Sequence, residues 1–174
     1  MAGSDAQSYR IAGRYIHDMG NGTSLTLAAM WENLEYEFDS VATTVFAEFG
    51  FNTTVFGTVT AGTNVDIDRD AWMISGKLTT NSPFNFRFMY AEADDYDVTA
   101  TFASGQSNRT SDTGADMTVL GVYYSLGDST EFGLTYNEVS NDTYGAYGTG
   151  IGAVGLGAIG SDNEIIALNV ITMF

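Results

Sequence analysis

Alternation of apolar and polar residues with a period of two is the feature that most constrains the fold of this chain. Segments with this pattern cover about residues 9–18, 23–32, 42–51, 54–63, 71–80, 84–92, 115–126, 130–138 and 164–174. No segment sustains a 3.6-residue period, and the chain contains 20 glycines but one proline. The sequence therefore predicts an all-β, antiparallel protein of about nine strands, with residues 1–174 in a single domain.

Short and long connections alternate between these segments. The short connections contain turn-forming residues, as in Met19–Gly22, Asn81–Pro83 and Gly127–Ser129. The long connections cover about residues 33–41, 64–70, 93–115 and 140–163. Outer-membrane β-barrels have short turns on one side of the membrane and long loops on the other. We therefore expect a transmembrane β-barrel.

Aromatic residues occur at two levels on the apolar face of the predicted strands. The level near the long connections comprises Tyr9, Trp31, Trp72, Tyr90 and Tyr136, and the level near the short turns comprises Phe49, Phe51, Phe84, Tyr124, Phe132 and Phe174. Two aromatic belts with aliphatic residues between them are typical of surfaces that cross a membrane. We interpret the face as lipid-facing, and the core of a soluble sandwich is the alternative.

Basic residues are few, and their positions suggest a second surface. The formal net charge is −16, which argues against nucleic acid as a partner, since phosphate binding requires basic residues. Arg10, Arg14, Lys77 and Arg87 lie within predicted strands at positions opposite to the apolar face, as does Glu48. We expect these side chains to line a water-filled pore and to influence its ion selectivity. The alternative is an ordinary solvated face of a sheet.

Enzymatic chemistry finds no support in the sequence. The chain has one histidine, His17, and no cysteine, so we expect no catalytic residues, metal site or cofactor. Residues 150–155 match a dinucleotide-binding fingerprint, but the required acid about 20 residues further on is missing. Acidic residues concentrate in the long connections, where we expect most of them to be solvated.

The last strand resembles the closing strand of bacterial outer-membrane barrels. Its apolar face would carry Ile166, Leu168, Val170 and the terminal Phe174. In those proteins such a strand, ending in an aromatic residue, is the signal that the barrel-assembly machinery recognises. The present chain departs from the usual signal at Thr172, where a tyrosine is common.

The segment Thr118–Tyr136 looks like a hairpin of Gram-negative general diffusion porins, in which a strand with leucine, glycine and tyrosine enters a tight turn. The resemblance covers the whole chain through motifs of low specificity. It implies a barrel of about sixteen strands, usually trimeric, in the bacterial outer membrane. It further implies contact with lipid and lipopolysaccharide, and passive diffusion of small hydrophilic solutes and ions.

Length and strand direction modify this expectation. A porin of this kind is about twice as long, and a first strand that starts on the long-loop side matches the last nine of about sixteen strands. We therefore interpret the chain as the C-terminal half of a porin that does not form a channel by itself. Two alternatives remain, namely an eight-stranded outer-membrane barrel with a structural or adhesive role, and a soluble acidic β-sandwich or adhesin.

Overall fold

The computed structural model describes residues 4–39, 61–101, 111–145, 147 and 160–172, and in these the chain forms strands and no helix. The strands are β1 (Ser4–Gly20), β2 (Thr23–Phe38), β3 (Val65–Thr79), β4 (Phe84–Ala93), β5 (Asp97–Ala100), β6 (Ala115–Leu126), β7 (Thr130–Asn141) and β8 (Asn163–Thr172). All neighbouring strands are antiparallel. The predicted all-β, antiparallel class is confirmed.

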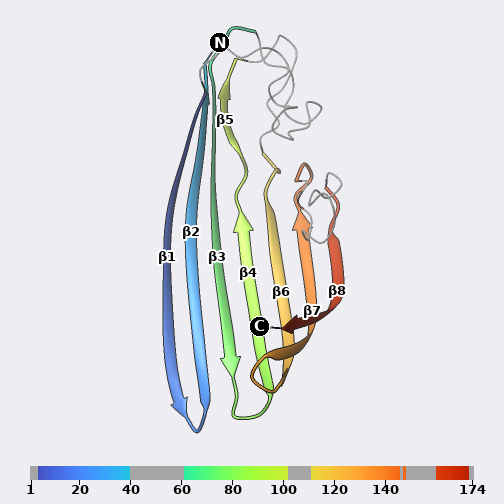
Figure 1. Ribbon diagram of the computed structural model, residues 1–174. Helices are drawn as coiled ribbons and strands as arrows, with labels where there is room; N and C mark the ends of the chain where they lie inside the picture. Colours follow the sequence, from blue (N-terminus) through green and yellow to red (C-terminus); the bar gives the residue numbers. More distant parts are fainter. Residues whose placement is uncertain (1–3, 40–60, 102–110, 146, 148–159, 173–174) are drawn as a thin grey trace.

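The strands form one sheet in the order β1-β2-β3-β4-β6-β7-β8, with β5 added beside the start of β3. Figure 1 shows the short turns at one end of the sheet, the turn end, and the longer connections at the other, the loop end. The β1–β2 turn illustrates the local chemistry, because Gly20, Asn21 and Gly22 all have positive φ, between 54° and 78°. Asn and Gly adopt such angles at little cost, which favours a tight hairpin at this point.

Residues 33–38 and 65–70 of two predicted connections are strand in the structure, so their assignment as loops was wrong. β2 continues to Phe38 and β3 begins at Val65, and the two strands pair without interruption from Ser24–Thr79 to Phe38–Val65. Acidic side chains such as Glu35 and Asp68 alternate here with apolar ones, so the period of two continues in a segment whose charge suggested a loop.

The predicted order of strands also needs correction. Because β2 pairs directly with β3, the predicted strands at 42–51 and 54–63 do not lie between them in the sheet. Residues 42–51 and most of 54–63 lie outside the described residues. β5 was not predicted, and it lies in the expected long connection of residues 93–115. The described residues form eight strands, and the prediction of strands at 42–51 and 54–63 is not tested by them.

The hydrophobic core cluster of the described residues lies at the loop end. Phe38, Val65, Ile67 and Val98 are buried together, each at most 6 % exposed. They come from β2, β3 and β5, whose side chains share one face of the sheet. No second sheet covers the other large apolar side chains of the described strands, so the layered core of a sandwich is not present in this part of the chain.

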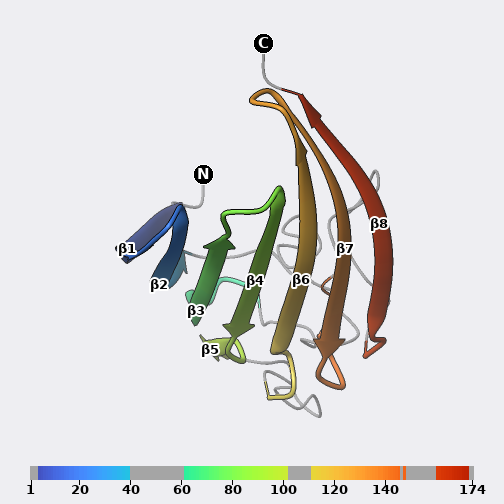
Figure 2. The ribbon, with the colours of Figure 1, turned by 90° about the horizontal axis from the view of Figure 1, so that it is seen from below.

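The sheet is curved rather than flat. Seen from below, successive strands follow a curved course with β1 and β8 at its two ends (Figure 2). β1 and β8 each pair with one neighbour only, so the described strands do not close into a barrel. Curvature of this kind is what a segment of a barrel wall requires.

Candidate membrane-facing and pore-lining surfaces

Strand register assigns the large apolar side chains to one side of the sheet, here called the apolar face. One complete row across it contains Tyr15, Leu27, Gly76, Phe88, Leu120, Tyr136 and Ile166. The adjacent row includes Leu78, Phe86, Val122, Leu134 and Leu168. Leu120 is 52 % exposed and Leu168 86 %. Soluble monomers rarely present such a contiguous apolar surface to water.

Aromatic side chains end the apolar face toward the loop end. Tyr9, Trp31, Trp72, Tyr90 and Tyr136 are each the last large apolar residue of their strand on this face before a polar one. The three tyrosine hydroxyls donate hydrogen bonds to that polar residue: Tyr9 to Gln7 at 2.8 Å, Tyr90 to Glu92 at 3.4 Å and Tyr136 to Glu138 at 3.0 Å. A ring on apolar surface with its hydroxyl on a polar group is the arrangement found at membrane interfaces.

These hydrogen-bond partners were missed in the sequence analysis. The available signal was a tyrosine followed, two positions away on the same face, by a glutamate or glutamine. At the turn end, Tyr124 lies opposite both Phe84 and Phe132, and the Phe84 and Tyr124 rings are 5.2 Å apart. β8 presents Ile166, Leu168 and Val170 on the same face. Phe49 and Phe174 lie outside the described residues.

The border between apolar and acidic side chains on this face crosses the sheet at a slant. Its first acidic residues, strand by strand, are Asp5, Glu35, Asp70, Glu92, Asp116, Glu138 and Glu164. Cross-strand pairing assigns each of these acids to the β3 residue at the same level of the sheet. In the same order, those β3 residues are 66, 68, 70, 72, 72, 74 and 74. The border therefore moves by 74 − 66 = 8 residues over six steps between strands.

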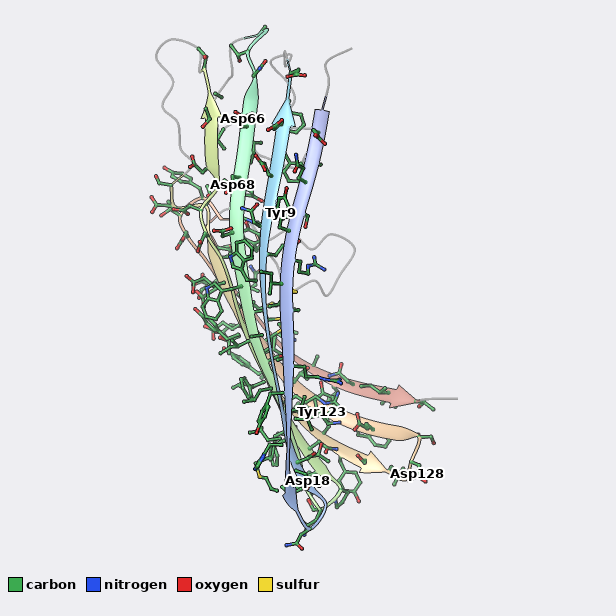
Figure 3. All side chains as sticks on the ribbon, turned by 90° about the vertical axis from the view of Figure 1, so that its left-hand side faces the viewer. Tyr9, Asp18, Asp66, Asp68, Tyr123 and Asp128 are labelled. Atoms are coloured by element: carbon green, nitrogen blue, oxygen red, sulfur yellow. The ribbon has the colours of Figure 1, made fainter. Side chains whose placement is uncertain are left out.

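Standard strand dimensions give the angle between this border and the perpendicular of the strands. Eight residues at about 3.4 Å correspond to roughly 27 Å along the strands, and six steps at about 4.8 Å to roughly 29 Å across them. The border is thus inclined by about 43° to the perpendicular of the strands. Figure 3 labels Asp66 and Asp68 near the loop end, and Asp18 and Asp128 near the turn end.

The other side of the sheet, here called the basic face, carries the described cations. Five of the six basic residues lie on it, namely Arg10, Arg14, Arg69, Lys77 and Arg87, and the sixth, Arg109, lies outside the described residues, as does Glu48. No described lysine or arginine lies on the apolar face, which instead carries a dense group of acids at the loop end. The two faces therefore differ in charge sign as well as in hydropathy.

Two ion pairs anchor part of the basic face. Arg10 donates to Glu32 through Nη2 at 2.7 Å and through Nε at 3.0 Å. Arg87 Nη2 lies 2.5 Å from Glu131 Oε2, and its guanidinium carbon lies 3.9 Å from the centroid of the Tyr123 ring. That ring covers Gly133 on β7, where an added Cβ would lie 2.5 Å from Tyr123 Cε1. Only glycine at 133 leaves room for this stacked arrangement.

Lys77 has a different environment. It lies directly opposite Arg87 on β4, and like charges in that position repel. Among the described residues neither Lys77 nor Arg14 forms an ion pair. This part of the basic face therefore has an excess of positive charge that water or a mobile anion must solvate.

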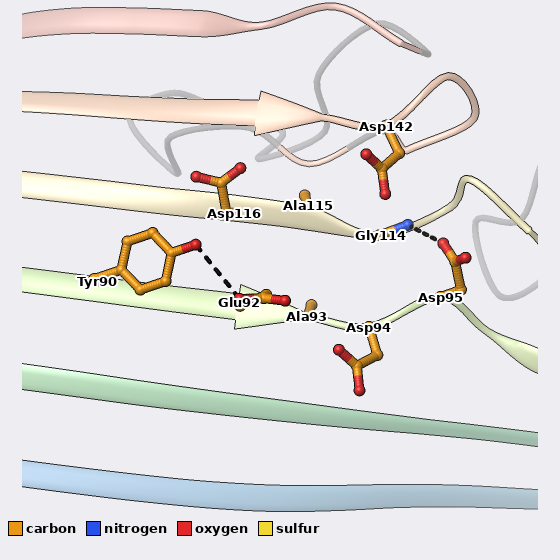
Figure 4. A pocket seen from close by; sticks show the side chains of 9 residues that line it. All are labelled: Tyr90, Glu92, Ala93, Asp94, Asp95, Gly114, Ala115, Asp116 and Asp142. Atoms are coloured by element: carbon orange, nitrogen blue, oxygen red, sulfur yellow. Dashed lines mark hydrogen bonds between the residues drawn. The ribbon is translucent and has the colours of Figure 1, made fainter.

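A pocket of about 340 Å³ at the loop end is lined by Glu92, Asp94, Asp95, Asp116 and Asp142, together with Tyr90 (Figure 4). Asp95 is held by the backbone, since it accepts hydrogen bonds from the amides of Thr113 at 2.6 Å and Gly114 at 2.8 Å. The described residues contain no group of three or more side chains arranged to hold a metal ion. The pocket concentrates negative charge without a metal-binding geometry.

Asp142 is expected to make the stability of the folded loop at this pocket depend on pH. Burial, followed by repulsion from Asp95, Asp112 and Asp116, raises the pKa of Asp142 above its ordinary value of 3.8. A carboxyl whose pKa is raised by folding disfavours the folded loop when ionised, so stability increases as pH falls toward 3.8. We expect Asp142→Asn to increase the hydrogen-exchange protection of the Gly145 amide, which donates to the Asp142 carbonyl at 2.9 Å, and to remove its pH dependence.

The control for this prediction is Asp128→Asn in the turn between β6 and β7, at the opposite end of the sheet. It should leave the protection of Gly145 unchanged. Equal pH dependence in the Asp142→Asn variant and the parent protein would contradict the assignment to Asp142.

Comparison with known proteins adds no relative to these observations. No protein-family model, curated protein or solved structure matches the chain. No helix in the described part is long and apolar enough to cross a membrane. Any functional conclusion therefore rests on the two faces of the sheet.

Proposed function

We propose that this chain forms part of the wall of an outer-membrane β-barrel channel. The channel lets small hydrophilic solutes and ions diffuse passively. The apolar face contacts lipid, the acidic loop end lies beside lipopolysaccharide headgroups, and the basic face lines the water-filled lumen. The observation that carries the proposal is the slanted border between apolar and acidic side chains.

The slant has a direct physical reason in a membrane. Strands of a transmembrane barrel are tilted by about 35–45° from the membrane normal, so the flat membrane surface meets neighbouring strands at successively different residues. The inclination of about 43° agrees with that tilt. In a soluble sandwich the apolar area follows the covering sheet, and nothing requires its border to shift by a similar amount from strand to strand.

Side-chain size and charge support the same orientation. The apolar face holds leucine, isoleucine, phenylalanine and tryptophan, whereas many positions on the basic face are alanine, glycine, serine or threonine. Cations such as Lys77 would cost roughly 2–4 kcal/mol on a lipid-facing surface at mid-depth, but a water-filled lumen solvates them. The basic lumen predicts a preference for anions.

Barrel closure requires strands in addition to those described. β1 and β8 both run from the loop end to the turn end, so pairing them with each other would give a parallel seam. In the proposed antiparallel barrel, a strand of opposite direction lies beside each edge. The barrel of about sixteen strands and the trimer implied by the porin resemblance belong to this proposal.

The test uses the native protein isolated from the outer-membrane fraction and reconstituted in planar bilayers. We expect heat-modifiable gel mobility, stepwise conductance and an anion-selective reversal potential in a salt gradient. Lys77→Glu should shift that potential toward cation selectivity, because it replaces an unpaired cation on the lumen wall with an anion.

Ser129→Glu in the exposed turn between β6 and β7 provides the control and should change selectivity much less. Recovery of the protein in the soluble fraction would contradict membrane insertion. A folded, inserted protein without conductance would favour the closed eight-stranded barrel instead.

A further inference from the structure

The basic face contains an apolar hollow of about 280 Å³ near the loop end. Its floor includes Ala71, Ala91 and Ala115, and thioether side chains of Met30, Met73 and Met117 surround it. Register explains the shape, since Met30, Met73, Ala91 and Met117 lie side by side in one row across β2, β3, β4 and β6. A hydrated ion gains nothing from contact with such an apolar surface, whereas the apolar part of an organic molecule can pack against it.

A cation without a counter-ion adjoins this hollow. Arg69 lies two residues before Ala71 on the same face of β3. Its guanidinium carbon is 4.9 Å from the centroid of the Tyr96 ring and 5.5 Å from that of the Tyr147 ring. Nη1 donates to the hydroxyls of both tyrosines, at 3.0 Å to Tyr96. Tyr147 also lines the hollow, so it connects the apolar surface to the guanidinium.

The charge of Arg69 is not compensated by the described protein groups. No described carboxylate pairs with it, and its Nε is enclosed without a hydrogen-bond partner. Burial raises the pKa of Tyr96, so that hydroxyl stays neutral and supplies no negative charge. The guanidinium therefore retains a full positive charge that no described carboxylate neutralises, so an anion can pair with it.

We propose that the Arg69 guanidinium and the alanine–methionine hollow form a binding site for a small organic carboxylate. The carboxylate accepts hydrogen bonds from Arg69, and the apolar body of the ligand packs against Met30, Met73 and Met117. Methionine side chains adapt to ligands of different outline, which suits a class of ligands rather than one. The site requires only the described fold and not the channel function. If the chain lines the proposed channel, the site lies on the path of the solutes.

The test titrates phenylacetate into the full-length protein, folded in detergent micelles and labelled with ¹³C at the methionine methyl groups. We expect saturable shifts of the Met30, Met73 and Met117 signals and none at Met19, which follows the apolar-face residues of β1 at the turn end. Phenylacetamide has the same shape without the charge, and its affinity should be lower by a factor of about ten or more. Arg69→Gln should weaken phenylacetate binding by a similar factor, and Arg69→Lys by less.

Ala91→Leu keeps Arg69 and fills the hollow, so it should abolish the shifts even if Arg69→Gln fails to fold. Equal binding of phenylacetate and phenylacetamide, unchanged binding to Ala91→Leu, shifts of equal size at Met19, or no shifts at all would each overturn the proposal. Conductance is measured separately, so a failed titration leaves the channel proposal standing, and a non-conducting protein can still bind phenylacetate.

Discussion

Leu120→Arg is expected to abolish assembly of the protein in the outer membrane, whereas Val119→Arg should leave most of it assembled. Leu120 lies in the middle of the apolar face, between Phe88 and Tyr136 in register, and is 52 % exposed. An arginine facing lipid at mid-depth costs roughly 2–4 kcal/mol, a large share of the stability of a typical domain. The fraction of protein with heat-modifiable mobility in the outer-membrane fraction measures the effect.

Val119 is the matched control because it is the preceding residue of the same strand and faces the opposite side. Its cross-strand neighbours are Met89 and Asn137 on the basic face, where a water-filled lumen can solvate an arginine. If the two variants assemble to the same extent, the apolar face does not contact lipid. If Val119→Arg is the more harmful one, the assignment of the two faces is reversed.

Glu131→Gln is expected to lower the free energy of unfolding by about 2 kcal/mol, while Glu32→Gln lowers it by at most about 1 kcal/mol. Both changes remove the acid of an ion pair on the basic face. The side chains of Arg87 and Glu131 are 31 % and 18 % exposed, whereas that of Arg10 is 57 % exposed. Without Glu131, the half-buried Arg87 faces Lys77 across the strand with no compensating carboxylate.

Urea titration of the folded protein in micelles, followed by strand circular dichroism, gives the two free energies. Charge loss is the same in both variants, so a difference between them reports the environment of the pair rather than net charge. Equal midpoints would show that water screens Arg87 as well as it screens Arg10. Arg87 would then not be held between Tyr123 and Glu131 as the structure indicates.

Alternation along the chain was sufficient to predict the class of fold and most strands. The alternation was not recognised at residues 33–38 and 65–70, where the acids Glu35, Glu37, Asp66 and Asp68 were expected to be solvated in long connections. In the structure these acids lie on one face while Tyr36, Phe38, Val65 and Ile67 pack on the other. An acid-rich strand with one buried face still keeps the period of two, so the alternation continues through both segments.

The candidate surfaces were predictable in part for the same reason. Parity within a strand placed Arg10, Arg14, Lys77 and Arg87 on one face, and the structure places them together there. Arg69 was assigned to a loop, so its position beside the alanine–methionine hollow was missed. The pairing of Arg87 with Glu131 joins residues 44 positions apart and has no signal in a single sequence.

Which side chains share a face follows from the sequence, because successive residues of a strand point to opposite sides of the sheet. Which residues of neighbouring strands lie level with one another is known from the folded sheet and not from the sequence. Register depends on turn length, bulges and the packing of each strand against the next, none of which alternation specifies. The slanted border of the apolar face and the enclosure of Arg69 by Tyr96 and Tyr147 are both consequences of that register and of the folded connections.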